Sequence, residues 1–128
     1  MQKRTLKDLK KLAQQLRSDT GCPWDRKQTI SSMLQYVEEE VAEVRQAIEN
    51  GDHKNLEEEL GDVLFQIVMI SQIAEEKKYF DLDGVLERIY DKIVSRHTWV
   101  FGEDKAKTPE EAIEMWRKNK EKEKEKRG

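Results

Sequence analysis

The feature that most constrains this chain is the spacing of its apolar residues, which recur every three or four positions in several long runs. Such spacing places apolar side chains on one face of an α-helix, whereas a half-buried strand would show a period of two. The only two prolines, Pro23 and Pro109, fall between these runs. The pattern therefore predicts an all-α fold, an antiparallel bundle of about five helices.

The expected helices have local start and stop signals. Their approximate ranges are 5–18, 30–49, 52–78, 83–96 and a last helix that begins at Pro109. Thr5 and Asp8 have the spacing of a capping box. Asn50 and Gly51 are typical of a helix end. Because so few residues separate the second helix from the third, we expect these two helices to pack antiparallel.

The third predicted helix carries apolar residues on two sides. Leu60 and Ile67 belong to one side, and Phe65, Met69 and Ile73 form the other. A helix that is apolar on both sides must be buried on both sides. So short a chain has few helices to supply the second layer, which we expect from another subunit packed against the Phe65 side. The core would then be completed by oligomerisation, in a homodimer or a homotetramer.

Composition excludes several classes of protein. Charged residues make up 40% of the chain, but 24 bases nearly balance 27 acids. A basic nucleic-acid-binding protein is therefore not expected. No apolar run approaches the ~18 residues of a membrane span, and the N-terminus lacks the apolar core of a signal peptide. We expect a cytoplasmic protein with no membrane or nucleic-acid partner. A single cysteine, Cys22, excludes an internal disulfide and a cysteine zinc cluster.

The charges are unevenly distributed along the chain. Residues 38–62 hold ten acids and two bases, a local charge of −8. Residues 117–127 hold seven bases and three acids, a local charge of +4. We therefore expect one globular domain over residues 1–116 and a charged extension of the last helix over residues 117–128.

Two acidic pairs in the acidic segment have helical spacing. Glu40 and Glu43 lie three apart on the second predicted helix, and Glu59 and Asp62 lie three apart on the third. Side chains at this spacing share a helix face, with β-carbons about 5–6 Å apart. Because both pairs border the apolar stripe of their helix, the antiparallel hairpin should bring all four carboxylates together along one edge of its seam.

Four neighbouring carboxylates repel one another unless a proton or a cation neutralises them. A set of oxygen ligands without histidine or cysteine suits a hard ion such as Mg²⁺ or Mn²⁺. Such an ion favours cleavage of a phosphate ester or phosphoanhydride, because it can neutralise phosphates and activate water. Acidic pairs at this spacing also occur on solvated helix faces, so a catalytically silent helical interaction module stays open.

The motif EEVAE at residues 39–43, followed by ELGD at residues 59–62, resembles the ExxE and ExxD signature of the MazG nucleoside triphosphate pyrophosphohydrolases. The resemblance extends over about residues 5–120 and includes GCPWD at residues 21–25, VFG at residues 100–102 and Trp116. Ser95 and the pair Thr98-Trp99 depart from the family pattern. Some family members carry two copies of the domain.

This resemblance implies a MazG-like fold and the hydrolysis of a nucleoside triphosphate to its monophosphate and pyrophosphate, with Mg²⁺ as cofactor and Mn²⁺ as a substitute. Such an enzyme would clear aberrant NTPs or dNTPs. A narrower enzyme that acts on dCTP, dUTP or phosphoribosyl-ATP is the alternative within this reaction class. The implied metal ligands are Glu40, Glu43, Glu59 and Asp62. The adjacent Glu39 is the candidate for orienting or deprotonating the attacking water.

The resemblance also implies a set of substrate-binding residues. Lys92 and Arg96 lie four apart on one helix face and would hold phosphate oxygens. Trp116 would stack on the base or ribose, with Lys120 adding charge nearby. Trp24, expected in the core or in a pocket, completes the set. Taken without the resemblance, the two basic residues would be an exposed helix face and the tryptophans core anchors.

Overall fold

The computed structural model describes residues 2–127, and this part of the chain contains helices and no strand. The predicted all-α class is therefore confirmed. The chain divides into two compact units, residues 1–82 and residues 83–128, each with its own packing. Among the described residues, no helix combines the length and the apolar composition needed to cross a bilayer.

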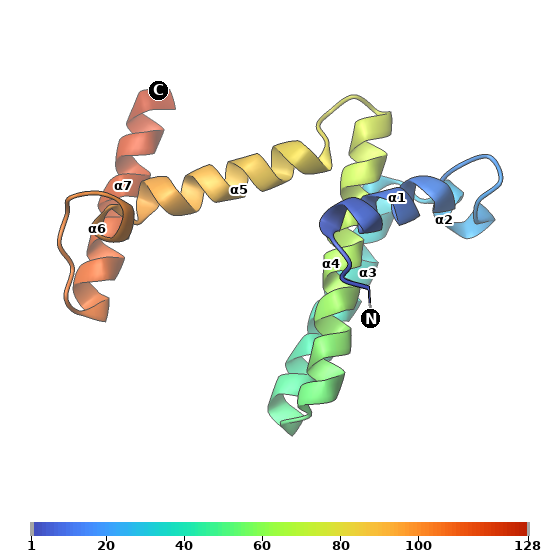
Figure 1. Ribbon diagram of the computed structural model, residues 1–128, viewed down its shortest axis with the longest axis horizontal. Helices are drawn as coiled ribbons and strands as arrows, with labels where there is room; N and C mark the ends of the chain where they lie inside the picture. Colours follow the sequence, from blue (N-terminus) through green and yellow to red (C-terminus); the bar gives the residue numbers. More distant parts are fainter. Residues whose placement is uncertain (1, 128) are drawn as a thin grey trace. The chain divides into compact units, whose positions relative to one another are not determined.

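Seven helices are found in the described residues rather than about five (Figure 1). The first unit contains α1 (Leu6–Leu16), α2 (Pro23–Lys27), α3 (Ile30–Asn50) and α4 (His53–Glu76). The second unit contains nearly all of α5 (Leu82–Arg96), then α6 (Thr98–Phe101) and α7 (Pro109–Arg127). The two additional helices, α2 and α6, are short and lie between the helices expected from the sequence.

Local signals set the helix boundaries. Thr5 accepts from the backbone N–H of Asp8, whose carboxylate accepts from the backbone N–H of Thr5, so the predicted capping box is present. Gly51 ends α3 in the left-handed conformation, with φ 64°, which glycine adopts without steric cost. Asp52 then caps α4 by accepting from the backbone N–H of Asn55 at 3.1 Å. This tight connection makes α3 and α4 an antiparallel hairpin (Figure 1).

The side of α4 that is buried within the first unit differs from the expected one. Met69 and Ile73 are only 2% and 1% exposed, and Phe65 packs against the same core. The partner subunit expected on this side is not needed, because residues of α1 cover it. The other side of α4 is open instead, with Leu60 at 52% and Ile67 at 41% exposure. The buried apolar residues of this core are Ala13, Met33, Val68, Met69, Ile73 and Leu82.

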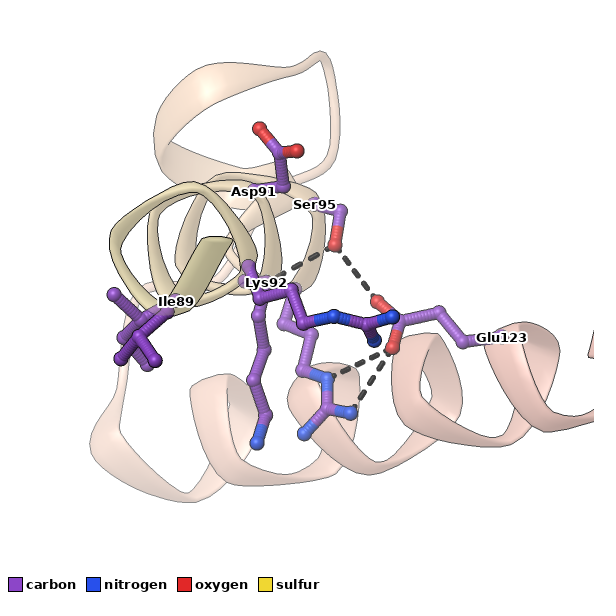
Figure 2. A pocket seen from close by; sticks show the side chains of 8 residues that line it. Ile89, Asp91, Lys92, Ser95 and Glu123 are labelled. Carbon is purple, nitrogen blue, oxygen red and sulfur yellow. Dashed lines mark hydrogen bonds and ion pairs between the residues drawn. The ribbon is translucent and has the colours of Figure 1, made fainter. Parts of the chain in front are cut away.

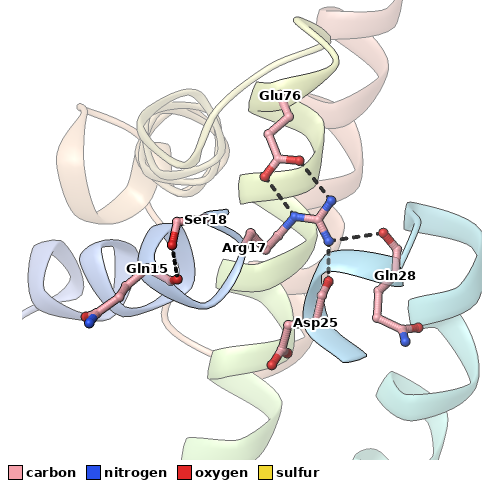
Figure 3. A network of polar contacts seen from close by, with 6 residues as sticks. All are labelled: Gln15, Arg17, Ser18, Asp25, Gln28 and Glu76. Carbon is pink, nitrogen blue, oxygen red and sulfur yellow. Dashed lines mark hydrogen bonds and ion pairs between the residues drawn. The ribbon is translucent and has the colours of Figure 1, made fainter. Parts of the chain in front are cut away.

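Arg17 ties together three segments at the end of α4 away from the Gly51 turn (Figure 3). Its guanidinium donates to both carboxylate oxygens of Glu76, at 2.7 and 2.8 Å. It also donates to the backbone carbonyl oxygens of Asp25 and Gln28. The hydrogen bonds from Arg17 are the main reason that the pKa of Glu76 lies below its usual value. One side chain therefore joins the end of α1, the α2 segment and the end of α4.

We expect Arg17→Met to lower the free energy of unfolding by about 2 kcal/mol, because it removes hydrogen bonds to a charged group and leaves two carbonyls without this donor. Urea denaturation would measure the change. Arg45→Met is the matched control, since Arg45 is exposed and forms its ion pair with exposed Glu49. Its expected cost is about 0.5 kcal/mol or less. Equal losses in the two variants would contradict the role of Arg17.

The second unit is held together by polar contacts between α5, α6 and α7. Asn119 on α7 is 6% exposed and donates to the backbone carbonyl of Arg96 at 3.0 Å. It also donates to the Thr98 hydroxyl at 2.9 Å. A buried amide with two such partners fixes the end of α5 and the start of α6 against α7. Helix α7 then continues to Arg127.

Candidate metal centre

The hairpin of α3 and α4 brings four carboxylates together. Glu40, Glu43, Glu59 and Asp62 each offer one oxygen, and these four oxygens all lie within 4.8 Å of one another. The predicted convergence of the two acidic pairs is thus seen in the structure. That these groups bind a metal ion stays a prediction.

The four side chains differ in their contact with solvent. Glu59 is buried at 9% exposure and Glu40 is half-buried, whereas Glu43 and Asp62 are exposed. Oε2 of Glu40 and Oε2 of Glu59 are both buried without a hydrogen-bond partner among the described residues. A buried acceptor without a partner costs free energy, so a hydrogen-bond donor or a cation beside each of these oxygens would be stabilising.

The crowding raises two pKa values. Glu59 has a pKa of about 7, first because its protonated form hydrogen-bonds Glu43, and then because of burial and the charges of the neighbouring carboxylates. For Glu40, burial is the main cause of a raised pKa, followed by the charges of Glu43 and Asp62. The site therefore attracts a proton when no cation neutralises it.

The ligand set fits a hard divalent cation. Each donor is a carboxylate oxygen, which Mg²⁺ and Mn²⁺ prefer. The buried oxygens of Glu40 and Glu59 without partners would gain one, and the exposed pair Glu43 and Asp62 leaves the site open to solvent. An open position next to fixed carboxylates is what a metal site needs in order to share its ion with a phosphate.

Glu39 lies outside this cluster. It is exposed on α3, although its charge contributes to the raised pKa of Glu40. Successive residues of a helix are about 100° apart around its axis, so Glu39 does not share the direction of Glu40. Its expected role with the attacking water stays a prediction.

Trp24 belongs to the same unit as the carboxylates. Its ring meets Tyr36 edge to face, with centroids 5.1 Å apart, and the side chain is 47% exposed. It is therefore neither a core residue nor enclosed in a pocket. Tyr36 stands one helical turn before Glu40 on α3, at a position that no motif in the sequence marks.

The other predicted substrate residues gather in the second unit. Lys92 and Arg96 line a cavity of about 720 Å³ (Figure 2). The guanidinium carbon of Arg96 lies 4.9 Å from the centre of the Trp116 ring. The amino group of Lys120 lies 5.3 Å from that ring. The structure thus groups four of these residues, and both cations are within reach of a cation–π interaction with Trp116.

Sequence reasoning missed three polar residues around Arg96. They are Ser95, Asn119 and Glu123. A signal was present for Asn119, because it lies three residues from Trp116 and so shares a helix face with it. Glu123 stood within a run of alternating lysines and glutamates, where nothing in the sequence distinguishes it from its neighbours.

Comparison with known proteins identifies the family. Residues 28–101 match the model of the MazG nucleotide pyrophosphohydrolase domain. A nucleoside triphosphate pyrophosphohydrolase from Escherichia coli K12 is 40% identical over 106 residues, which are 82% of this chain and 40% of that protein. The nucleoside triphosphate pyrophosphohydrolase/pyrophosphatase MazG from Thermotoga maritima is 42% identical over 96 residues, covering 75% of this chain and 38% of its own length.

A solved structure agrees with the sequence matches. The crystal structure of a mazG-related protein from Thermotoga maritima matches with a TM-score of 0.74 and 31% identity, over 90% of this chain and 98% of that chain. The chain spans less than half the length of the curated relatives it matches.

The raised pKa of Glu59 predicts how stability depends on pH. Between its usual value near 4.5 and about 7, the folded metal-free protein holds a proton that the unfolded chain releases. Stability should therefore fall as pH rises through this window, and level off above it. Glu59→Gln should flatten the dependence, whereas Glu57→Gln, at an exposed position on α4, should not. Melting temperatures in EDTA at several pH values test this, and a rise in stability across the window would refute it.

Proposed function

The chain belongs to the MazG nucleotide pyrophosphohydrolase family, and we propose that it hydrolyses nucleoside triphosphates to nucleoside monophosphates and pyrophosphate with Mg²⁺. The observation that carries this proposal is the cluster of four carboxylates with oxygens within 4.8 Å of one another. Clearance of aberrant NTPs or dNTPs in the cytoplasm is the role we infer.

Glu40, Glu43, Glu59 and Asp62 would hold the ion in this proposal. When bound, Mg²⁺ neutralises phosphate oxygens and lowers the pKa of a water molecule. Glu59 must release its proton for the ion to bind, which its pKa of about 7 permits near neutral pH. Glu39, exposed beside the cluster, would orient the attacking water or accept its proton.

Four of the predicted substrate-binding residues lie in the second unit, and we propose a nucleotide-binding role for each. Lys92 and Arg96 line one cavity and offer the charged N–H donors that phosphate oxygens accept. Trp116 and Lys120 lie next to Arg96, and the indole would stack on the base. Trp24 is half exposed on the first unit and is the remaining aromatic candidate for nucleotide contact.

The test is pyrophosphate release from a panel of NTPs and dNTPs, with Mg²⁺ and with EDTA. Glu40→Gln and Asp62→Asn should each lower kcat/KM by a factor on the order of 10² or more, because charge stabilisation in the transition state is lost. Both variants should stay folded, since each removes a repelling charge. The control is Glu38→Gln, exposed on the same helix and outside the cluster.

The outcomes of this panel separate the proposals. Turnover of dCTP, dUTP or phosphoribosyl-ATP alone would point to the narrower enzyme. No turnover of any nucleotide by the wild type would favour a silent interaction module, and full activity in Asp62→Asn would refute the metal site.

A second copy of the chain is the partner we propose for the open side of the hairpin. Leu34, Val41 and Ile48 recur every seven residues on α3 and are 58%, 52% and 61% exposed. The residue after each buried carboxylate, Val41 after Glu40 and Leu60 after Glu59, points to the same side because the two helices are antiparallel. A two-fold axis at this face would pair two hairpins into a four-helix bundle.

We expect Leu34→Glu and Leu64→Glu to convert a homodimer into monomers, because each places a charge in the proposed interface. Light scattering coupled to gel filtration measures the mass. Leu12→Glu adds the same charge at an exposed apolar position of α1 and should leave the dimer intact. Phe65→Glu should instead unfold the first unit, since Phe65 packs against its core. A monomeric wild type would contradict this assembly.

A further inference from the structure

The cavity of the second unit contains a set of hydrogen-bond donors gathered on one carboxylate of the chain itself. The hydroxyl of Ser95 donates to Oε1 of Glu123 at 2.7 Å. Nε and Nη2 of Arg96 both reach Oε2 of Glu123 at 3.0 Å. Figure 2 shows Glu123 extending from α7 to meet these donors, with Lys92 at the same cavity. Three donors on the two oxygens of one anion form a binding site for an oxoanion.

Arg96 is fixed in place for this task. Its side chain is 9% exposed, and the ring of Trp116 lies 4.9 Å from the guanidinium carbon. Asn119 holds the backbone carbonyl of Arg96 at 3.0 Å. A stacked and immobilised guanidinium presents its N–H edge in a defined direction, and this edge recognises carboxylates and phosphates alike.

Glu123 occupies the position through which an external anion would have to reach that edge. Its side chain is 27% exposed, three times the value for Arg96, so Glu123 is the more accessible member of the pair. Its neighbours on α7, Lys122 and Lys124, are exposed. The segment that carries Glu123 is close to the end of α7, at Arg127, where a helix opens at the lowest cost.

We propose that Ser95 and Arg96 form an oxoanion cradle for a phosphate group, and that Glu123 occupies this cradle until the phosphate displaces it. The proposal rests on the proposed function, since it assigns a terminal phosphate of the nucleotide to this cavity. It adds Ser95 as a phosphate-binding residue and Glu123 as a built-in competitor that lowers the affinity for anions. A phosphate with two charges replaces a carboxylate with one, so the exchange is favourable and reversible.

Calorimetric titration of the full chain with inorganic tripolyphosphate in EDTA tests this directly. Glu123→Gln keeps the shape of the side chain and removes its charge, so it should bind tripolyphosphate on the order of tenfold more tightly than the wild type. Glu125→Gln makes the same charge change two residues further along α7, at an exposed position. Its affinity should stay within about twofold of the wild type, because its distance from the cradle leaves only screened charge effects.

Two further variants keep the test decisive. Glu123→Asp retains the charge but is one methylene shorter, so it should compete less well and give a smaller gain than Glu123→Gln. Ser95→Ala in the Glu123→Gln background should remove much of the gain, because one donor is lost. Unchanged or weaker binding in both Glu123 variants would overturn the proposal, since Glu123 would then orient Arg96 rather than compete for it.

The test of the cradle can fail or succeed independently of the test of the proposed function. A gain in tripolyphosphate affinity together with no NTP hydrolysis by the wild type would overturn the proposed function and leave the cradle standing. NTP hydrolysis by the wild type without any gain in Glu123→Gln would overturn the cradle alone.

Discussion

The four carboxylates of the first unit repel one another, and the rest of that unit must offset this repulsion. Their oxygens lie within 4.8 Å of one another at the seam of α3 and α4, with Glu59 buried. Forces elsewhere must hold this hairpin closed. The turn at Gly51 fixes one end, and the core around Met33 and Ile73 together with the Arg17–Glu76 pair fixes the other. Stabilising contacts therefore flank the acidic site on both sides. The site itself can hold repelling charges because the packing that stabilises the hairpin lies elsewhere.

Much of this arrangement could be predicted from the sequence because it is local. Capping of α1 by Thr5, the end of α3 at Gly51 and the convergence of the acidic pairs all involve residues close in the chain or related by one hairpin. The orientation of α4 could not be predicted. Both its faces are apolar, and the choice is made by α1, whose residue Ala13 belongs to the same buried core as Ile73, sixty residues further along the chain. Helical periodicity contains no information on such a distant contact.

In the second unit, too, a contact between distant residues could not be predicted from the sequence, that of Glu123 with Ser95 and Arg96. Between Lys118 and Lys126 the chain repeats lysine and glutamate in near alternation, and every glutamate in this stretch has equivalent neighbours. Only the position of α5 selects Glu123 as the partner of Ser95 and Arg96. An exposed pair at this place would contribute little. The Arg96–Glu123 pair differs, because the Arg96 side chain is only 9% exposed and an unpaired charge there would be costly.

The acidic cluster of the first unit and the Arg96 site of the second unit share one constraint, because each holds a charge with little access to solvent. In the functions proposed above, a cation would neutralise the first site and a phosphate group would pair with the second. Each site needs a substitute partner when that ligand is absent, because neither charge is tolerated alone. A proton serves at Glu59, whose pKa is about 7, and Glu123 serves at Arg96. We propose that both substitutes give way to a ligand, the proton to a divalent ion and Glu123 to a phosphate group. Each unit can therefore remain neutralised while its own proposed ligand is absent.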